Sequence, residues 1–246
     1  YHALQLRIQK RFSNGFEFTA SHNWSKNIGN GPIGVKNAET GSDSGIGSGQ
    51  NINNLWNYKS YDRSRLDQDV RHNFVFNYSY ELPLGGGKKF GTNLKGVSNA
   101  LLGGWQINGI VTARTGLPIT LTGPGYAVTN FCRTCVVRPL LKPGGNNNPV
   151  IGKLDHYYDE TQFLPVQPGF FGNLGRNTLD GPDLTKVDFS IFKTITVREG
   201  KNLHFRAEFF NLPNHPNFAG PSSALVFETT GQYPGEGAGG RVVKTI

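Results

Sequence analysis

Residues 3–21 read ALQLRIQKRFSNGFEFTAS, two runs in which apolar and polar side chains alternate on either side of a short turn. In the first run Leu4, Leu6 and Ile8 fall on one face, and the intervening glutamines and arginines fall on the other. A side-chain period of two predicts β-strands. The Asn14-Gly15 pair favours the positive φ angles of a tight hairpin turn. This stretch therefore predicts an antiparallel hairpin with one apolar face and one polar face.

The same alternation recurs in four later segments, and no segment keeps a helical period for more than two turns. These segments cover about Phe74–Leu82, Trp105–Arg114, Val187–Ile195 and Leu203–Phe209. A four-residue turn at 199–202 is expected between the last two. The pattern is imperfect, because four apolar residues fall on the polar face: Val75, Ile110, Phe192 and Phe210. The fold class predicted is all-β, with antiparallel strands.

Composition narrows the class of protein further. The 246 residues include 33 Gly, 12% aromatic residues and only 17% charged residues, which is unlike a helical protein and unlike a disordered one. No apolar run approaches the roughly 18 residues of a membrane-spanning helix. The net charge of +8 is scattered along the chain rather than clustered, so nucleic acid is not an expected partner.

The connections alternate between short and long. Long loops are expected at about 26–69, 117–183 and 212–238, far longer than the median of roughly 4–6 residues in compact domains. Outer-membrane barrels combine short periplasmic turns with long extracellular loops. The pattern therefore predicts up-and-down strands of a transmembrane β-barrel. A soluble β-sandwich would also alternate, but it does not explain the loop asymmetry.

The medium-length connection at 83–104 contains Leu94, Val97, Leu101 and Leu102, and this spacing predicts one or two turns of amphipathic helix on the periplasmic side.

Three polar residues fall on the otherwise apolar faces, and all three lie near strand ends: Lys10, His22 and Lys193. A charge costs about 0–1 kcal/mol near the membrane interface, instead of about 2–4 kcal/mol at the midplane. Aromatic residues are expected to form girdles at both interfaces. Trp24 lies at the extracellular rim, and the periplasmic rim holds Phe12, Phe16, Tyr80 and Trp105.

Candidate functional residues are polar and charged side chains rather than catalytic ones. Residues expected to face the lumen or a ligand are Arg7, Glu17, Arg71, Glu81, Arg114, Asp188, Arg206 and Glu208. The densest charge cluster, residues 62–72, is interpreted first as an ion-pair network bracing strand and loop at the rim. The alternative is that this cluster grips an anionic or peptide ligand at the barrel mouth.

Cys132 and Cys135 form a single C-x-x-C pair in the longest loop. The chain has no second C-x-x-C and no nearby histidine, so a disulfide in an oxidising compartment is favoured over a zinc or redox site. No arrangement typical of a nucleophile, phosphate-binding loop or calcium loop occurs. We therefore expect a protein that is not an enzyme and that holds no cofactor and no metal.

Several motifs occur in an order found in a known family. They are residues 10–15 (KRFSNG), 24–26 (WSK), 71–76 (RHNFVF), 81–83 (ELP), 101–107 (LLGGWQI), 115–118 (TGLP), 171–177 (FGNLGRN), 205–211 (FRAEFFN) and 214–218 (NHPNF). Together they resemble the C-terminal barrel portion of TonB-dependent outer-membrane receptors, in particular the Oar-like group, whose members carry a carboxypeptidase-regulatory-like domain.

The resemblance implies a barrel of about 22 strands with an N-terminal plug, which takes up a bound nutrient when TonB pulls on the receptor. Residues 1–246 then correspond to the C-terminal segment of the barrel, with the plug and the final strand absent. The implied location is the bacterial outer membrane, with the loops facing outward. The implied partners are outer-membrane lipid, an unidentified nutrient ligand, and TonB through the missing N-terminal part.

Two other functions remain open at this point. Six strands are fewer than the roughly eight of the smallest barrels, and open strand edges pair with other chains. The chain could therefore self-associate into a surface fibre or layer, with the two cysteines as cross-links. A soluble carbohydrate-binding sandwich is the other alternative, and it requires Phe74, Phe76 and Tyr78 to pack in a closed core.

Overall fold

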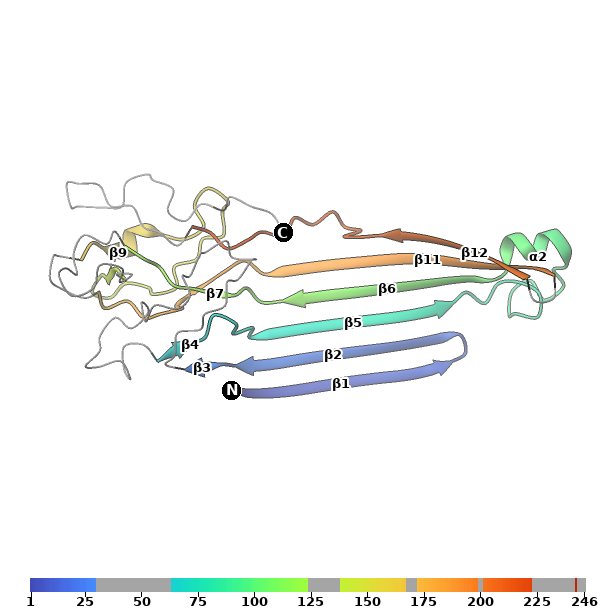
Figure 1. The fold of residues 1–246 in the computed structure, drawn as a ribbon, viewed down its shortest axis with the longest axis horizontal. Coiled ribbons are helices and arrows are strands. Elements are labelled where there is room, and N and C mark those ends of the chain that lie inside the picture. Colours follow the sequence, from blue (N-terminus) through green and yellow to red (C-terminus); the bar gives the residue numbers. More distant parts are fainter. Residues whose placement is uncertain (30–62, 124–137, 167–171, 199–200, 223–241, 243–246) are drawn as a thin grey trace.

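The computed structural model describes residues 1–29, 63–123, 138–166, 172–198, 201–222 and 242. Its main element is one sheet of six antiparallel strands, in which every strand pairs with its neighbour along the chain (Figure 1). The strands are β1 (His2–Ser13), β2 (Phe16–Lys26), β5 (His72–Glu81), β6 (Trp105–Arg114), β11 (Leu184–Arg198) and β12 (Lys201–Phe209). All six predicted strands are present, and the predicted all-β, antiparallel fold class is confirmed.

The first hairpin turns where the sequence predicts. Asn14 and Gly15 have φ angles of 53° and 78°, the left-handed values that a two-residue turn requires. The pairing register shifts between Lys10 and Ser13, which places a β-bulge just before the turn. At the other end of the sheet β12 begins at Lys201. Residues 201 and 202, expected in a four-residue turn, therefore belong to the strand.

The register joins the apolar positions of neighbouring strands into continuous rows. One row runs Ile8–Ala20–Phe76–Val111–Val187 through four successive pairs. Directly opposed residues of antiparallel strands lie on the same face. A slip of one residue would send each of these side chains to the opposite face. The sheet therefore has one apolar face, as the alternation predicts.

The adjacent rows form the polar face. One of them runs Arg7–Ser21–Val75–Thr112–Lys186, so Val75 is an apolar exception, as the sequence indicates. Ile110 pairs with Asn77 and Asp188 and is the second exception, with 49% of its surface exposed.

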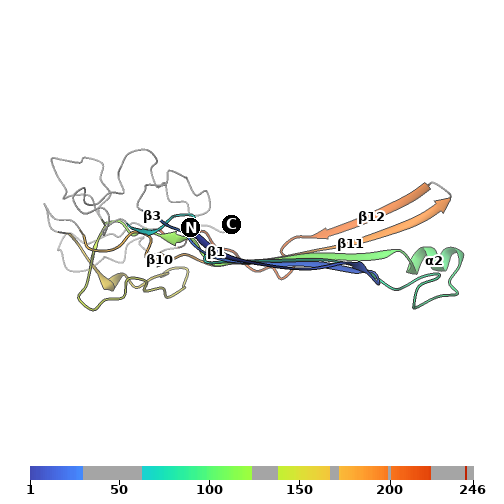
Figure 2. The same ribbon diagram turned by 90° about the horizontal axis from the view of Figure 1, so that it is seen from below.

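Within the described residues no second layer covers either face of the sheet. Figure 2 shows the strands almost edge-on, with the β11–β12 hairpin bending away from the plane of the others. Phe74 is 37% exposed, and neither Phe76 nor Tyr78 is buried. The described residues therefore do not form the soluble sandwich, because a sandwich packs such side chains against a second sheet.

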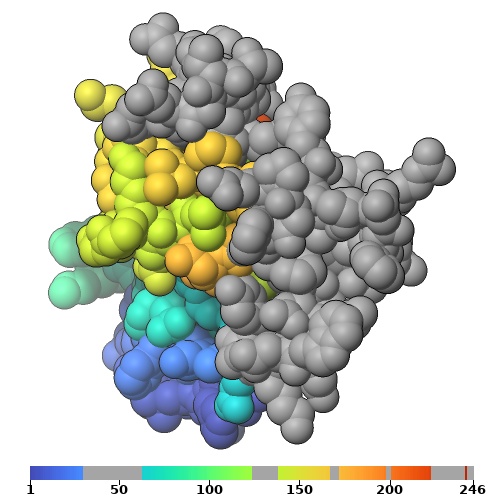
Figure 3. Space-filling model, turned by 90° about the vertical axis from the view of Figure 1, so that its left-hand side faces the viewer, coloured from blue at the N-terminus to red at the C-terminus, as the bar shows by residue number. Residues whose placement is uncertain are grey.

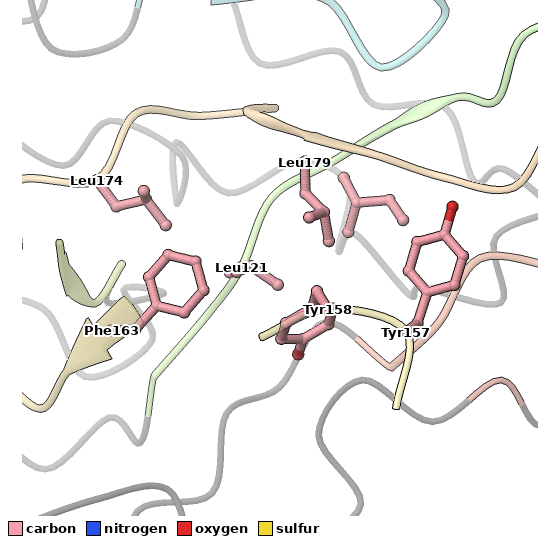
Figure 4. Close-up of a cluster of buried hydrophobic side chains, with 7 residues drawn as sticks. Leu121, Tyr157, Tyr158, Phe163, Leu174 and Leu179 are labelled. Carbon is pink, nitrogen blue, oxygen red and sulfur yellow. The ribbon is translucent and has the colours of Figure 1, made fainter. Parts of the chain in front are cut away.

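The buried core lies instead among the segments at one end of the sheet, here called the loop end. It consists of Ile119, Leu121, Tyr157, Tyr158, Phe163, Leu174 and Leu179 (Figure 4). Short ladders surround it: β7 (Pro118–Ile119) pairs with β10 (Leu179–Asp180), and β8 (Leu140–Leu141) with β9 (Phe163–Leu164). A 3-10 turn, η2 (Glu160–Gln162), precedes β9. The expected long loop at 117–183 thus contains a folded unit with its own core.

The opposite end of the sheet, the turn end, carries the two-residue turn between β1 and β2 and the medium-length connection between β5 and β6. The helix α2 (Gly96–Leu102) lies between β5 and β6 at this end (Figure 1), which confirms the helix expected there. No helix among the described residues is long and apolar enough to cross a membrane.

Candidate functional site

The two longest loops are joined at Asn177, which is 3% exposed. Its side-chain Nδ2 donates to the Arg65 carbonyl oxygen at 2.8 Å and to Asp67 Oδ1 at 2.5 Å. Its Oδ1 accepts from the Thr120 hydroxyl at 2.7 Å. The backbone φ of 55° is left-handed, a conformation that asparagine tolerates better than most residues. One side chain therefore links residues 63–69 to the unit that follows β6.

Two arginines reinforce this junction by binding backbone carbonyls. Arg65 lies in the two-residue strand β4 (Ser64–Arg65), which pairs with β3 (Ile28–Gly29). Its guanidinium donates to the carbonyls of Asn177 and Thr178 and forms an ion pair with Asp180 at 2.5 Å. From the opposite side, Arg176 donates to the Ser64 hydroxyl at 2.8 Å and to the Gly29 carbonyl.

Asp69 connects the same region to the ends of the long strands. Its side chain is fully buried. Its Oδ1 accepts from the Asn27 backbone N–H at 2.6 Å, and its Oδ2 lies 3.7 Å from Arg71. Within the described part of the charged stretch, residues 63–72, Arg65 and Asp69 therefore brace strand and loop at the rim, in agreement with the first interpretation. Figure 3 looks onto this end, where the cyan residues around β4 lie between the first hairpin and the loop unit.

A cavity of about 480 Å³ opens where the strand ends meet the loop unit. Residues just outside β5 and β6 contribute Arg71, Thr115 and Gly116. The other lining residues come from the segments between the long strands: Arg65, Asn148, Val150, Tyr157, Asp180, Gly181 and Asp183. We call this the rim cavity. It is within the usual size range of small-molecule sites.

The charges of the rim cavity are balanced, with two arginines facing two aspartates. Asp180 is held by Arg65 and by Asn148 Nδ2 at 2.7 Å. Asp183 accepts from the Gly116 N–H at 2.8 Å. The Nε of Arg71 is buried and has no hydrogen-bond partner within the described part of the chain. A buried donor without a partner costs about 1–3 kcal/mol. The Arg71 side chain as a whole is 35% exposed, so its more accessible atoms are the ones that a ligand in the cavity can contact.

Tyr157 supplies the aromatic surface of the cavity and is 7% exposed. Burial raises the pKa of its phenol well above the ordinary value, and the negative charges of Asp183 and Asp180 raise it further. The hydroxyl therefore remains protonated and able to donate. An aromatic ring beside arginines, aspartates and amides can bind a polar, hydrogen-bonding ligand.

The loop unit also contains a buried carboxylate, Glu160, which is 7% exposed. Burial, with a smaller effect from the charge of Asp159, raises the pKa of Glu160 to about 7. Asp159 itself caps the 3-10 turn by accepting from the Thr161 N–H at 3.0 Å, and hydrogen bonds lower its pKa. Among the described residues no cluster of three or more metal-ligating side chains occurs.

Of the eight residues expected to face a lumen or ligand, Arg71 lies in the wall of the rim cavity. The strand members occupy the polar face: Arg7, Glu17, Glu81, Arg114, Asp188, Arg206 and Glu208. Several are ion-paired there, including Arg206 with Glu208, Asp188 with Lys186 and Glu81 with Lys88. The cysteines expected to form a disulfide, Cys132 and Cys135, lie outside the described residues.

The expected girdle residues lie at the two ends of the sheet. Trp24 is at the loop end, where its ring stacks 6.2 Å from His72. Phe16 meets Tyr80 edge-on at 5.8 Å at the turn end, and Phe12 lies in the bulged segment of β1. Trp105 opens β6 at the same end. Their role in contacting the membrane interface stays a prediction.

Sequence reasoning did not identify Asn177, Tyr157 or Asp180 as site residues. Asn177 ends the motif FGNLGRN at 171–177, which resembles the family's motif but carries no periodicity that assigns it a role in a site. Tyr157 and Asp180 stand in segments without any periodicity, so no sequence signal placed them beside Arg71.

Comparison with known proteins identifies a family. No curated protein and no solved structure matches the chain. A family model described as an outer membrane beta barrel domain matches residues 1–244. Such a domain requires antiparallel strands with an apolar face toward lipid and a polar face toward the interior, and the six strands have both. The chain therefore belongs to the outer membrane beta barrel domain family, whose location is the bacterial outer membrane.

Proposed function

We propose that this chain forms part of a TonB-dependent receptor that binds a nutrient ligand at the loop end and takes it up across the outer membrane. The rim cavity is the observation that carries the proposal, because it lies between the folded loops and the strand ends and is lined by polar side chains from both. The motif order shared with Oar-like receptors supports the TonB-dependent step.

The lengths of the connections support an orientation with the loop end outward. At the turn end β1 and β2 are joined by two residues, Asn14 and Gly15. At the loop end the chain builds a folded unit between β6 and β11. Outer-membrane barrels direct short turns to the periplasm and long loops outward, so the rim cavity would meet ligands arriving from outside.

The chemistry of the cavity favours a polar ligand of low net charge. Arg65 is already paired with Asp180, and Arg71 is backed by Asp69. A strongly anionic ligand would face Asp183 and Asp180 as well as the arginines. A sugar or a short peptide offers hydroxyl or carbonyl acceptors to the partly exposed Arg71 side chain and an apolar surface to the Tyr157 ring.

Growth measurements in the source bacterium test this proposal. Strains lacking the gene, lacking tonB, or carrying Arg71→Ala are compared on single carbon, nitrogen and iron sources supplied at limiting concentration. We expect one source on which both deletions grow poorly and on which Arg71→Ala needs a higher concentration for half-maximal growth. Lys153→Ala, an exposed loop variant outside the cavity, should grow like the parent. If no source separates the deletion strains from the parent, nutrient uptake is wrong.

A second candidate function follows from the edges of the sheet. Within the described residues β1 and β12 each pair with one neighbour only. Unpaired edges accept further strands from the same protein or from other chains, so copies could assemble side by side into a fibre or layer. Electron microscopy of the purified chain distinguishes the two functions. Ordered polymers in water favour assembly, and single particles that require detergent favour the receptor.

A further inference from the structure

The connection between β5 and β6, residues 83–104, exposes an unusual amount of apolar surface. We call it the turn-end segment. Its helix α2 buries none of its residues. Val97 is 77% exposed and Leu101 63% exposed, and three more side chains are more than one third exposed: Leu84, Phe90 and Leu102. Exposed apolar clusters of this kind mark contacts with another surface.

The segment is nevertheless folded and fixed in position. Asn99 accepts from the Gly86 N–H at 2.6 Å through its side chain and from the Gly103 N–H at 2.8 Å through its backbone. The backbones of Gly85 and Gly103 pack so closely that a Cβ added at Gly85 would lie 2.7 Å from the Gly103 Cα. The exposed apolar side chains therefore stand on an ordered scaffold.

Two side chains of the apolar face hold α2 in place. Lys193 is 6% exposed and donates to the carbonyls of Leu101 at 2.9 Å and Gly103 at 2.7 Å. Trp105 Nε1 donates to the same Leu101 carbonyl at 3.1 Å, and its ring lies 4.4 Å from the Lys193 ammonium. Lys193 and Trp105 are paired with each other across β11 and β6. The helix is therefore attached on the side of the sheet that faces lipid.

The charge of the segment has one sign. Residues 83–104 contain Lys88, Lys89 and Lys95 and no acidic residue. Lys88 forms an exposed pair with Glu81 at 3.3 Å, and Lys89 lies 5.6 Å from the ring of Phe90. Lysines interspersed with exposed leucine, valine and phenylalanine are the composition of segments that lie in a membrane interface.

We infer that the turn-end segment is an interfacial anchor that binds the anionic phospholipids of the leaflet at the turn end. Its leucines, Val97 and Phe90 enter the boundary of the acyl chains, and its lysines bind the phosphate groups. Because α2 is attached to the lipid-facing side, both contacts form together. This inference rests on the family's place in the membrane and not on nutrient uptake.

Fluorescence quenching in vesicles tests the inference directly. Trp24→Phe with Trp56→Phe leaves Trp105, beside α2, as the only tryptophan. The protein is inserted into mixed phosphatidylcholine and phosphatidylglycerol vesicles in which one lipid or the other carries brominated acyl chains. We expect brominated phosphatidylglycerol to quench Trp105 more than brominated phosphatidylcholine at the same mole fraction. Raising the salt concentration should reduce this preference, because it screens exposed charges.

Charge variants identify the source of the preference. Lys88→Gln, Lys89→Gln and Lys95→Gln combined should make the two lipids quench equally, since each lysine at an anionic surface favours contact up to about fivefold. A matched control removes the same charge at loop-end residues: Lys26→Gln, Lys142→Gln and Lys153→Gln. This control should leave the preference unchanged.

A second reporter checks that the preference is local. Trp56→Phe with Trp105→Phe leaves Trp24 at the loop end of the same apolar face, and its quenching should not distinguish the two lipids. Equal quenching of Trp105 by both lipids in the parent protein would overturn the inference. Quenching by neither lipid would also overturn it, because the segment would then stand away from the bilayer.

Discussion

Replacing Asn177 by alanine is expected to release the two long loops from each other. The substitution removes the bonds from Nδ2 to Arg65 and Asp67 and the bond that Oδ1 accepts from Thr120. At about 1 kcal/mol for each bond, the junction loses about 3 kcal/mol. Alanine must also adopt the left-handed φ of 55°, which costs about 1 kcal/mol more. The total of about 4 kcal/mol corresponds to about a thousandfold more frequent opening of the junction.

Hydrogen exchange followed by mass spectrometry measures this opening segment by segment. Exchange should accelerate in peptides covering 63–70 and 172–183, while peptides from β5 and β6 keep their protection. Asn177→Gly loses the same bonds without the backbone strain. Its exchange should therefore rise less than that of Asn177→Ala, by about a factor of five to ten. The reasoning fails if the two variants are identical, or if the strands lose protection together with the loops.

Three further predictions concern the loop unit and the turn end. Phe163→Ala removes a fully buried ring of the loop core and should destabilise that unit by about 3–5 kcal/mol. Leu154→Ala, at a 47% exposed position, should have little effect. Rates of limited proteolysis within residues 138–183 would compare the two variants. Because burial raises the pKa of Glu160 from 4.5 to about 7, the folded unit binds a proton more tightly than the unfolded chain, so its stability should fall as the pH rises through this interval. Glu160→Gln should abolish that dependence. Hydrogen exchange of the loop unit, corrected for the intrinsic exchange rates, measures it. Equal rates in the parent protein at pH 4.5 and at about pH 7 would refute the raised pKa of Glu160. Lys193→Met keeps the length of the side chain but removes both hydrogen bonds to the end of α2. Hydrogen exchange in α2 should therefore rise while that of β1 and β2 stays constant. Unchanged protection of α2 would show that Lys193 does not hold the helix.

The sheet could be predicted from the sequence because its signal is local and repeated. In an antiparallel meander each strand pairs with the next, so the faces of Leu4, Leu6 and Ile8 and those of Phe74 and Phe76 follow from alternation alone. The short turn at Asn14 and the helix in residues 83–104 are equally local features. Even the exceptions Val75 and Ile110 are visible in the pattern.

The loop unit could not be predicted for the opposite reason. Its core combines Leu121, Tyr158, Phe163 and Leu174, isolated apolar residues that no period connects. They meet through two-residue ladders and through side-chain bonds such as those of Asn177, which depend on the tertiary arrangement. The residues of the rim cavity are scattered in the same way, so Arg71 was identified from its charge while Tyr157 was missed.

The central claim is that the six strands place one face against lipid and the other against water. Spin labels in the membrane-inserted protein test this most directly, in a background of Cys132→Ser and Cys135→Ser that removes the native cysteines. Labels are attached after Phe76→Cys or Asn77→Cys, at adjacent positions in the middle of β5. We predict that the label at position 76 is relaxed by oxygen, which partitions into lipid, and the label at position 77 by a water-soluble nickel chelate. Equal accessibility of the two positions to both reagents would contradict the account.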